Sequence, residues 1–397
     1  MGPLLPIFLI VAVDVLALTI VIPLMPFYAE HFGASPAVVG YLGASFALCQ
    51  LISGPILGQL SDRFGRKPML LISQVGTFAG FLIQATAQSL AWVFCGRLMD
   101  GITAGNLSIA QAYISDVTAP ENRAKAFGVI GIAFGLGFLV GPAISAALSG
   151  FGIHMPFIAA ATLSALSIVA TYFLLPGKAL ATSPTPAKEG ARRTLDWRIY
   201  TKYFRDPQIA SYLLLFFCFT LSFALFISGF ALFAERRFLH HGTPWGPKQV
   251  GYLFAYAGFL GLIVQGGLLG RLVKWLGERK LALVGFTTAT AGYFLLSQSR
   301  ELPGLIVATT LSSLGHGVLR PAITSLVSRA VGPTEQGTVL GLTQSLNSIS
   351  LVIAPLFSGY LIHHQWLEAW ALMPALCAAI GATISTLSLR KAVPHAT

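Results

Sequence analysis

Stretches of about 20 mostly apolar residues follow one another along almost the whole chain. A helix of that length crosses the hydrocarbon core of a bilayer and pairs its own backbone polar groups on the way. Of the 397 residues, 55% are hydrophobic and only 10% are charged, which excludes an ordinary soluble domain. The first apolar run is followed at once by others, so we interpret it as a span and not as a cleaved signal. The sequence predicts an all-α membrane protein.

The apolar runs predict twelve transmembrane helices. Their expected ranges are 4–28, 36–60, 69–88, 91–117, 124–149, 154–175, 209–234, 247–273, 280–298, 303–331, 336–362 and 366–389. The only long hydrophilic stretch runs from Gly177 to Asp206 and contains Ser183-Pro184-Thr185-Pro186. We therefore expect an N-terminal six-helix bundle (1–176), a cytoplasmic linker (177–208) and a C-terminal six-helix bundle (209–397).

The net charge of +11 would suit a nucleic-acid-binding protein, but its distribution favours a membrane protein. Most cations fall in alternate loops and in the hydrophilic stretch, as the positive-inside rule requires when both termini are cytoplasmic. The loop cations are Arg63, Arg66, Lys67, Arg123, Lys125, Arg271, Lys274, Arg279, Lys280, Arg390 and Lys391. We expect a bacterial inner-membrane location, lipid as surroundings and no nucleic-acid partner.

A short charged turn separates the second and third predicted spans. Gly65 is placed to adopt a positive φ at a tight reversal. Asp62 lies near a helix C-terminus, where an anion is disfavoured unless cations such as Arg63 or Arg66 neutralise its charge. With Gly58, these residues form the pattern G-x-x-x-D-R-x-G-R-K. This pattern resembles the corresponding loop of the major facilitator superfamily, and we expect it to gate the transport cycle.

The two halves of the chain repeat each other at an offset of 212 or 213 residues. Gly58-x-x-x-Asp62 recurs as Gly270-x-x-x-Lys274, Gly65-Arg66-Lys67 as Gly277-Glu278-Arg279, Ser115-Asp116 as Ser328-Arg329, and Gly141-Pro142 as Ala354-Pro355. The repeat predicts two pseudo-symmetric bundles, the parallel arrangement of major facilitator transporters. The resemblance implies that the first, fourth, seventh and tenth helices line a central cavity.

Four ionisable residues fall inside spans on these cavity helices. They are Asp14, Arg97, Asp100 and Arg320. Such residues cost about 2.5–3.5 kcal/mol to insert and usually serve function. Arg97 and Asp100 are three residues apart and therefore neighbours on one helix face. The alternative is a static ion pair that only holds helices together.

The first predicted span matches D-x₈-P-x₂-P through Asp14, Pro23 and Pro26. This pattern resembles the first helix of tetracycline-type drug:proton antiporters, and Arg97-x-x-x-Gly101-x-x-x-Gly105 resembles their fourth-helix motif. The resemblance implies proton coupling through Asp14, with Arg97 and Asp100 as further candidates. Pro23 also removes the backbone bond to the Thr19 carbonyl and predicts a bend there.

Small residues line the fifth predicted span, including Gly135, Gly141 and Pro142. They let helix backbones approach closely. With the trailing Gly-Pro they resemble the antiporter motif of exporters, which implies that this segment seals the cavity and that transport runs outward. These three residues complete our set of gating candidates.

Our substrate-binding candidates are Gln50, Asn106, Phe223, Phe226, His316 and Arg320. The phenylalanines would provide an adaptable apolar wall. Three substrate-specific positions of tetracycline exporters are replaced here by Gly80, Gly261 and Ala289, which argues against tetracycline–metal efflux. If Arg320 pairs with Asp14, a cationic or neutral substrate fits; if Arg320 is free, an anion fits. The first arrangement is our expectation.

No phosphate-binding loop, catalytic acid–base pair, nucleophile or metal-ligand spacing is present in the sequence. Cys49, Cys95, Cys218 and Cys377 each stand alone in an apolar run. We expect a monomeric, proton-coupled antiporter of small hydrophobic or amphipathic compounds, with no enzymatic activity, cofactor or metal. The alternatives are an organic-anion carrier or facilitator that uses Arg320, and a non-transporting membrane receptor or scaffold.

Overall fold

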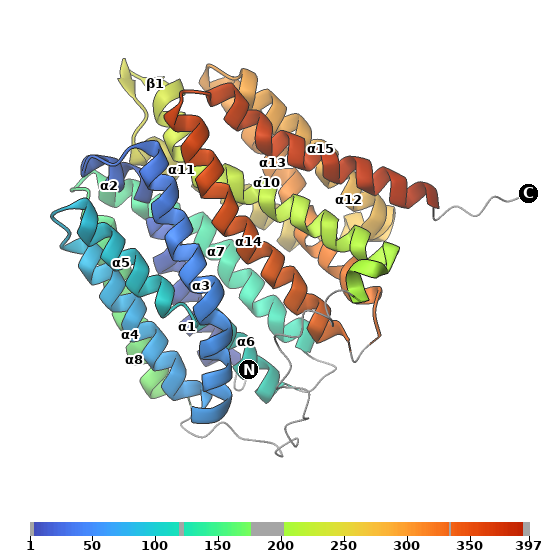
Figure 1. Cartoon of the computed structure of the whole chain (residues 1–397), viewed down its shortest axis with the longest axis horizontal. Helices are drawn as coiled ribbons and strands as arrows, with labels where there is room; N and C mark the ends of the chain where they lie inside the picture. Colours follow the sequence, from blue (N-terminus) through green and yellow to red (C-terminus); the bar gives the residue numbers. More distant parts are fainter. Residues whose placement is uncertain (1–3, 119–122, 176–201, 333–334, 392–397) are drawn as a thin grey trace, which may run out of the picture. The chain divides into compact units, whose positions relative to one another are not determined.

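The computed structural model describes residues 4–118, 123–175, 202–332 and 335–391, which are almost entirely helical (Figure 1). These residues form two compact units. The first combines the helices up to residue 175 with Leu239–Phe259, and the second combines residues 202–238 with Leu260 onward. Most of the predicted linker, residues 177–201, lies outside the described residues, whereas Lys202–Arg205 are helical.

The helices correspond closely to the predicted spans. In the first half they are α1 (Leu4–Val21), α2 (Met25–His31), α3 (Pro36–Phe64), α4 (Arg66–Ala85), α5 (Leu90–Ile102), α6 (Asn106–Val117), α7 (Arg123–Ser149) and α8 (Met155–Leu174). In the second half they are α10 (Pro207–Arg237), α11 (Pro247–Ile263), the π-helix η3 (Val264–Leu268), α12 (Leu269–Gln298), α13 (Leu302–Arg329), α14 (Gln336–His363) and α15 (Leu367–Lys391). A short hairpin pairs β1 (Leu239–His240) with β2 (Thr243–Pro244).

Within the described residues, nine helices are long and apolar enough to cross a membrane, or ten if the bent α1–α2 pair forms one span. This confirms the all-α membrane class. One of the nine is the continuous stretch Pro247–Gln298, which covers two predicted spans and reverses at Gly277, where φ is 70°. The predicted span 91–117 is instead divided between α5 and α6. The number twelve stays a prediction.

Two helix breaks interrupt the spans of the first unit. The bend between α1 and α2 is 46°, and it confirms the break expected at Pro23. The break between α5 and α6 was not predicted. There the Ser73 hydroxyl of α4 donates to the Thr103 carbonyl and accepts from the Gly105 amide at 2.9 Å. A buried side chain thus binds the backbone groups that the interruption frees, and the interruption is tolerated at membrane depth.

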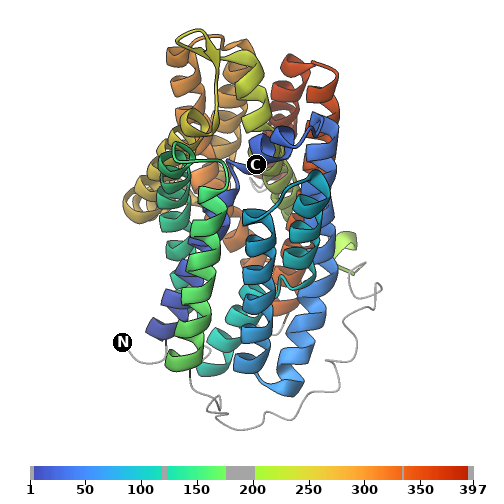
Figure 2. The same ribbon diagram turned by 90° about the vertical axis from the view of Figure 1, so that its left-hand side faces the viewer.

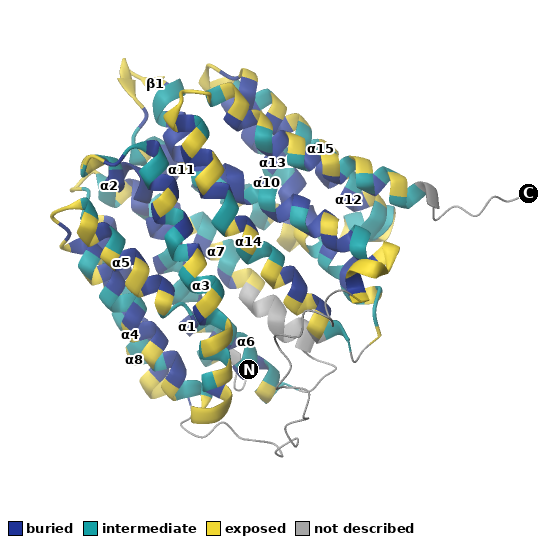
Figure 3. Cartoon of the chain, in the orientation of Figure 1, coloured by how far each residue is buried: buried dark blue, intermediate teal, exposed yellow. Residues whose placement is uncertain are grey.

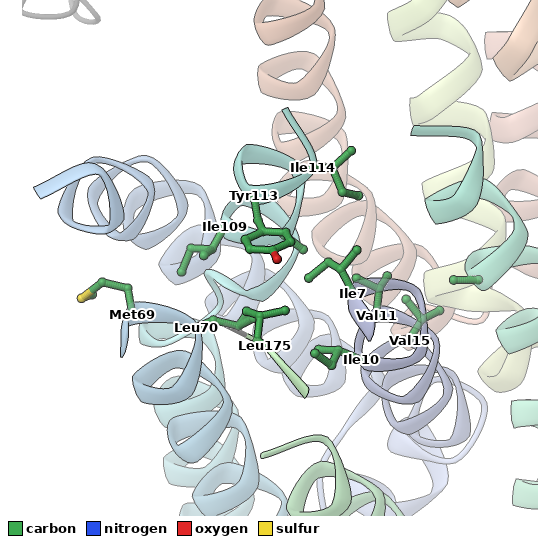
Figure 4. Close-up of a cluster of buried hydrophobic side chains, with 12 residues drawn as sticks. Ile7, Ile10, Val11, Val15, Met69, Leu70, Ile109, Tyr113, Ile114 and Leu175 are labelled. Carbon is green, nitrogen blue, oxygen red and sulfur yellow. The ribbon is translucent and has the colours of Figure 1, made fainter. Parts of the chain in front are cut away.

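Apolar packing builds each unit separately. In the first, α1 packs on α7 and α8, and α4 packs on α5 and α8 (Figure 2). Ile7, Ile10, Val11 and Val15 of α1 meet apolar residues of α4 and α6 in one buried cluster (Figure 4). In the second, α12 packs on α13 and α15, and α10 on α14 and α15. Large exposed apolar side chains are spread along the helices, as contact with lipid requires (Figure 3).

The small residues of α7 allow close approach of two other helices of the first unit. Thr19 of α1 lies against Gly137 and Gly141, and its hydroxyl oxygen is 2.9 Å from the Gly137 carbonyl. On α11, a Cβ added at Gly251 would lie 2.6 Å from the Pro142 carbonyl oxygen. The predicted close packing of this segment is confirmed; its role in sealing a cavity stays a prediction.

Gly141→Ala should destabilise the protein. The added Cβ would overlap the Thr19 hydroxyl and lie 2.8 Å from Thr19 Cβ. We expect a cost of about 1–3 kcal/mol, seen as a lower melting temperature in detergent. The matched control is Gly131→Ala in the same helix, where nothing lies within 4 Å of the new Cβ. Equal melting temperatures for the two variants would contradict this packing.

Candidate functional site

Arg66 is the centre of the charged turn in the first half. Gly65 has φ 97°, which confirms the expected reversal and turns the chain directly into α4. Arg66 Nη1 lies 2.5 Å from Asp62 Oδ1, and its Nε lies 2.7 Å from Asp116 Oδ2 at the end of α6. Nη1 also donates to the Ser61 hydroxyl at 2.6 Å. One guanidinium therefore joins the ends of three helices.

Lys67 makes a further contact that the sequence analysis did not predict. Its Nζ donates to the carbonyls of Tyr172 and Leu175, at 2.7 and 2.6 Å. These belong to the last turn of α8 and the residue after it, where carbonyls have no partner within the helix. A cation there also suits the negative end of the helix dipole. The basic turn therefore connects to α8 as well as to α6.

The corresponding turn of the second half carries the same ion pair with its charges exchanged. Glu278 stands where the first half has Arg66, and Arg329 stands where it has Asp116. Arg329 Nη2 lies 3.0 Å from Glu278 Oε1, which also accepts from Ser325 at 3.2 Å. The repeat predicted the equivalence of these positions but not the pairing. Lys274, the counterpart of Asp62, is exposed.

We expect the polarity of the first pair to be exchangeable. Arg66→Glu and Asp116→Arg should each lower thermal stability, by about 1 kcal/mol or more, because like charges then meet. Combining them should recover part of the loss, because the second half already uses the reversed pair. Recovery should be incomplete, since the new carboxylate at position 66 would face Asp62. Strictly additive losses, measured by melting temperature, would show that the two side chains do not interact.

A buried amide holds the Asp14 carboxylate in the first unit. Gln74 of α4 is fully buried, and its Nε2 lies 3.4 Å from Asp14 Oδ2 and 2.8 Å from the Ser167 hydroxyl of α8. Gln74 Oε1 has no hydrogen-bond partner in the described structure. Sequence reasoning missed Gln74 and Ser167; the available signal was a polar residue within each apolar run. Asp14 is thus held by neutral groups.

Arg97 and Asp100 lie together, as their spacing predicts. Arg97 Nη1 is 3.7 Å from Asp100 Oδ2, and their residues are 9% and 4% exposed. The Phe46 ring lies 4.0 Å from the guanidinium carbon, a cation–π distance. Asp100 also has a hydrogen bond with Thr77. The two charges compensate each other inside a largely buried environment.

Substituting neutral residues for Arg97 and Asp100 should show whether the pair only stabilises the fold or also takes part in transport. Asp100→Asn alone leaves a buried unpaired cation and should cost about 3–5 kcal/mol, whereas Arg97→Gln with Asp100→Asn should cost less. If the pair takes part in proton coupling, the double variant should fold but lose gradient-driven transport by about tenfold or more. Melting temperature and transport would be measured together. Normal transport by the double variant would identify a static ion pair.

In the second unit, His316 and Arg320 of α13 face the aromatic side chains of α10. The His316 ring lies 5.6 Å from Phe219, 5.4 Å from Phe223 and 5.5 Å from Tyr293 of α12. The Arg320 guanidinium carbon lies 5.5 Å from the Phe219 ring. His316 Nδ1 is 3.0 Å from the Ser312 carbonyl, and Nε2 is buried without a partner in the described structure. The structure brings three of the predicted substrate residues together here: Phe223, His316 and Arg320.

The remaining substrate candidates are distributed differently. Phe226 is 6% exposed and packs on Phe230 and Tyr293. Asn106 begins α6 directly after the helix break, and its buried Oδ1 has no partner in the described structure. Gln50 is half-buried on α3.

Gly80 is the residue that the resemblance to tetracycline exporters matches to an acid of those proteins. A Cβ there would lie 2.8 Å from the Gly96 carbonyl oxygen and 2.9 Å from Asp100 Cβ. An acidic side chain therefore does not fit without movement of α5. The described residues also contain no group of three or more His, Cys, Asp and Glu side chains arranged to hold a metal ion.

Comparison with known proteins decides the family. The family model described as "Major Facilitator Superfamily" matches residues 7–299 and 268–396. The chain belongs to the major facilitator superfamily. It is 32% identical over 369 residues to the tetracycline resistance protein, class E, of Escherichia coli, covering 91% of this chain and 88% of that protein. It is 27% identical over 365 residues to multidrug resistance protein 2 of Bacillus subtilis (strain 168), covering 90% and 89%.

The fold is shared with a structure described as the human organic anion transporter MFSD10 (TETRAN). The TM-score is 0.72 at 22% identity, covering 96% of this chain and 98% of that one. Membership of this superfamily makes the protein a multi-pass membrane transporter of small molecules and not an enzyme. The receptor or scaffold alternative is thereby set aside.

Proposed function

We propose that this transporter is a proton-coupled antiporter that exports small hydrophobic or amphipathic compounds by alternating access. The observation that carries the proposal is the environment of Asp14. Its carboxylate lies in a membrane-spanning helix, and within the described part of its own unit no cation lies within ion-pair distance. Arg97, the cation that the sequence places inside a span of the same unit, is paired with Asp100. A carboxylate held by neutral partners can take up and release a proton without first breaking an ion pair.

Export is supported by two further observations. The relatives include a tetracycline resistance protein and a multidrug resistance protein, both of bacteria. The Gly137–Gly141 face of α7 packs closely on α1, the helix that carries Asp14. A movement of one of these helices would therefore displace the other. We place the protein in a bacterial inner membrane as a monomer with cytoplasmic termini, driven by the proton gradient without a cofactor.

The charged turn is proposed to gate the cycle. Arg66 connects Asp62 at the end of α3 with Asp116 at the end of α6. Side chains that tie several helix ends together favour one arrangement of those ends, and their release permits another. Gly58, Arg63 and Gly65 belong to the same turn, and Gly135, Gly141 and Pro142 belong to the close-packed α7.

Asp14→Asn should abolish coupling while leaving the protein folded. We expect uptake of ethidium, Nile red or fluorescein into everted vesicles, driven by an imposed pH gradient, to fall by about tenfold or more for whichever dye is transported. Exchange of the same dye at equal pH should persist, because amide and carboxyl groups have similar shapes.

The matched control is Glu301→Gln, which removes an exposed carboxylate that makes no side-chain cap bond. It should transport like the unmodified protein. Uphill transport by Asp14→Asn at the normal rate would place the coupling site elsewhere.

A further inference from the structure

Arg320 differs from the other three ionisable residues of the predicted cavity helices. Asp14 has Gln74 and Ser167, and Arg97 has Asp100, all within the first unit. Within the described part of the second unit, Arg320 has no carboxylate or hydrogen-bond acceptor in reach, and its guanidinium lies beside the Phe219 ring. The residue is nevertheless exposed. A charged guanidinium at membrane depth is costly unless an anion lies beside it. Because it has five N–H donors, an anion with several oxygen atoms, such as a carboxylate, suits it best.

His316 adds a second polar atom one helical turn away. The Ser312 carbonyl only accepts hydrogen bonds, so Nδ1 of His316 must carry the proton that it donates. In the neutral ring, Nε2 then has a free lone pair. This atom is buried, its residue is only 9% exposed, and it has no partner in the described structure. A buried acceptor without a partner is costly, which indicates that a hydrogen-bond donor belongs there.

Aromatic side chains lie beside both polar groups. Phe219 lies beside both His316 and Arg320, and Phe223 and Tyr293 complete the surroundings of the histidine. Flat apolar surfaces of this kind favour a ring that can stack on them. The planar guanidinium can stack on the ring of a ligand and can also bind an anionic group that the ring carries.

We propose that Arg320, His316, Phe219, Phe223 and Tyr293 form a binding site for aromatic organic acids that carry a hydroxyl group. The carboxylate binds the Arg320 guanidinium, the hydroxyl donates to His316 Nε2, and the ring packs among Phe219, Phe223 and Tyr293. This inference rests on the proposed export function, for which it names a substrate class. It takes the anionic alternative for the charge of the substrate, because Arg97 is paired with Asp100, whereas the described part of the second unit places no anion beside Arg320.

Binding to the purified full-length protein in detergent tests the site without any gradient. The probes are benzoate, the three hydroxybenzoate isomers, benzyl alcohol and benzyltrimethylammonium, each titrated by calorimetry. At least one hydroxybenzoate should bind more tightly than benzoate, and the neutral and cationic probes should bind about tenfold more weakly or not at all. Preference for the cation, or no binding of any acid, would overturn the proposal.

Three variants then assign the contacts. Arg320→Gln should weaken hydroxybenzoate binding by about tenfold or more. His316→Phe keeps a ring but lacks Nε2, so it should abolish the advantage of hydroxybenzoate over benzoate. Arg271→Gln, which removes one exposed charge elsewhere in the same unit, should bind as the unmodified protein does. Unchanged binding in Arg320→Gln would overturn the site.

Two further comparisons keep the outcomes distinct. If Arg320→Gln does not fold, Arg320→Lys replaces it: it should retain selectivity for acids at reduced affinity, because the charge remains and the paired donors are lost. If everted vesicles take up a cationic dye through Asp14 while no acid binds, the export function stands and the substrate class is wrong. If acids bind but no gradient drives their transport, the site stands and the coupling proposal is wrong.

Discussion

The requirement that every backbone polar group find a partner in hydrocarbon governs this structure. Unbroken helices meet it by themselves, so each interruption needs an outside partner. At the break between α5 and α6 that partner is the Ser73 hydroxyl, which serves one carbonyl and one amide. At the Pro23 bend, the Ile22 amide still bonds to Leu18 and the Leu24 amide to Val21, so little is left unpaired. The two helix interruptions are therefore stabilised by particular side chains and by local backbone hydrogen bonds.

These irregular points lie close to the polar residues of the first unit. Asp100 is three residues before Thr103, where α5 is interrupted, and Asn106 follows the interruption directly. Close packing depends on the same surroundings, because Gly80 and Gly96 let α4 and α5 approach at the level of Asp100. Charges, small residues and helix breaks thus form one arrangement, in which altering one part disturbs the others.

Much of this could be predicted from the sequence, because its signals are local or periodic. Apolar length predicted the helices, Pro23 the bend, Gly65 the reversal, and the three-residue spacing the Arg97–Asp100 contact. The break at Thr103 could not be predicted, since its cause is Ser73, 30 residues away in the sequence. Gln74 and Ser167 were missed for the same reason: they come near Asp14 only because α8 packs on both α1 and α4. The roles assigned to all of these residues stay predictions.

The exchanged ion pairs also bear on the history of the gene. A protein built from a duplicated half is exposed to recombination between its own repeats, which would copy one turn into the other. Copying the first turn alone would set an arginine against Arg329, and copying the second would set a glutamate against Asp116, at positions where the native partners are about 3 Å apart. Each exchange would set like charges together. Copying either turn into the other half would therefore carry a cost in stability, which two turns of opposite polarity avoid only while they stay different.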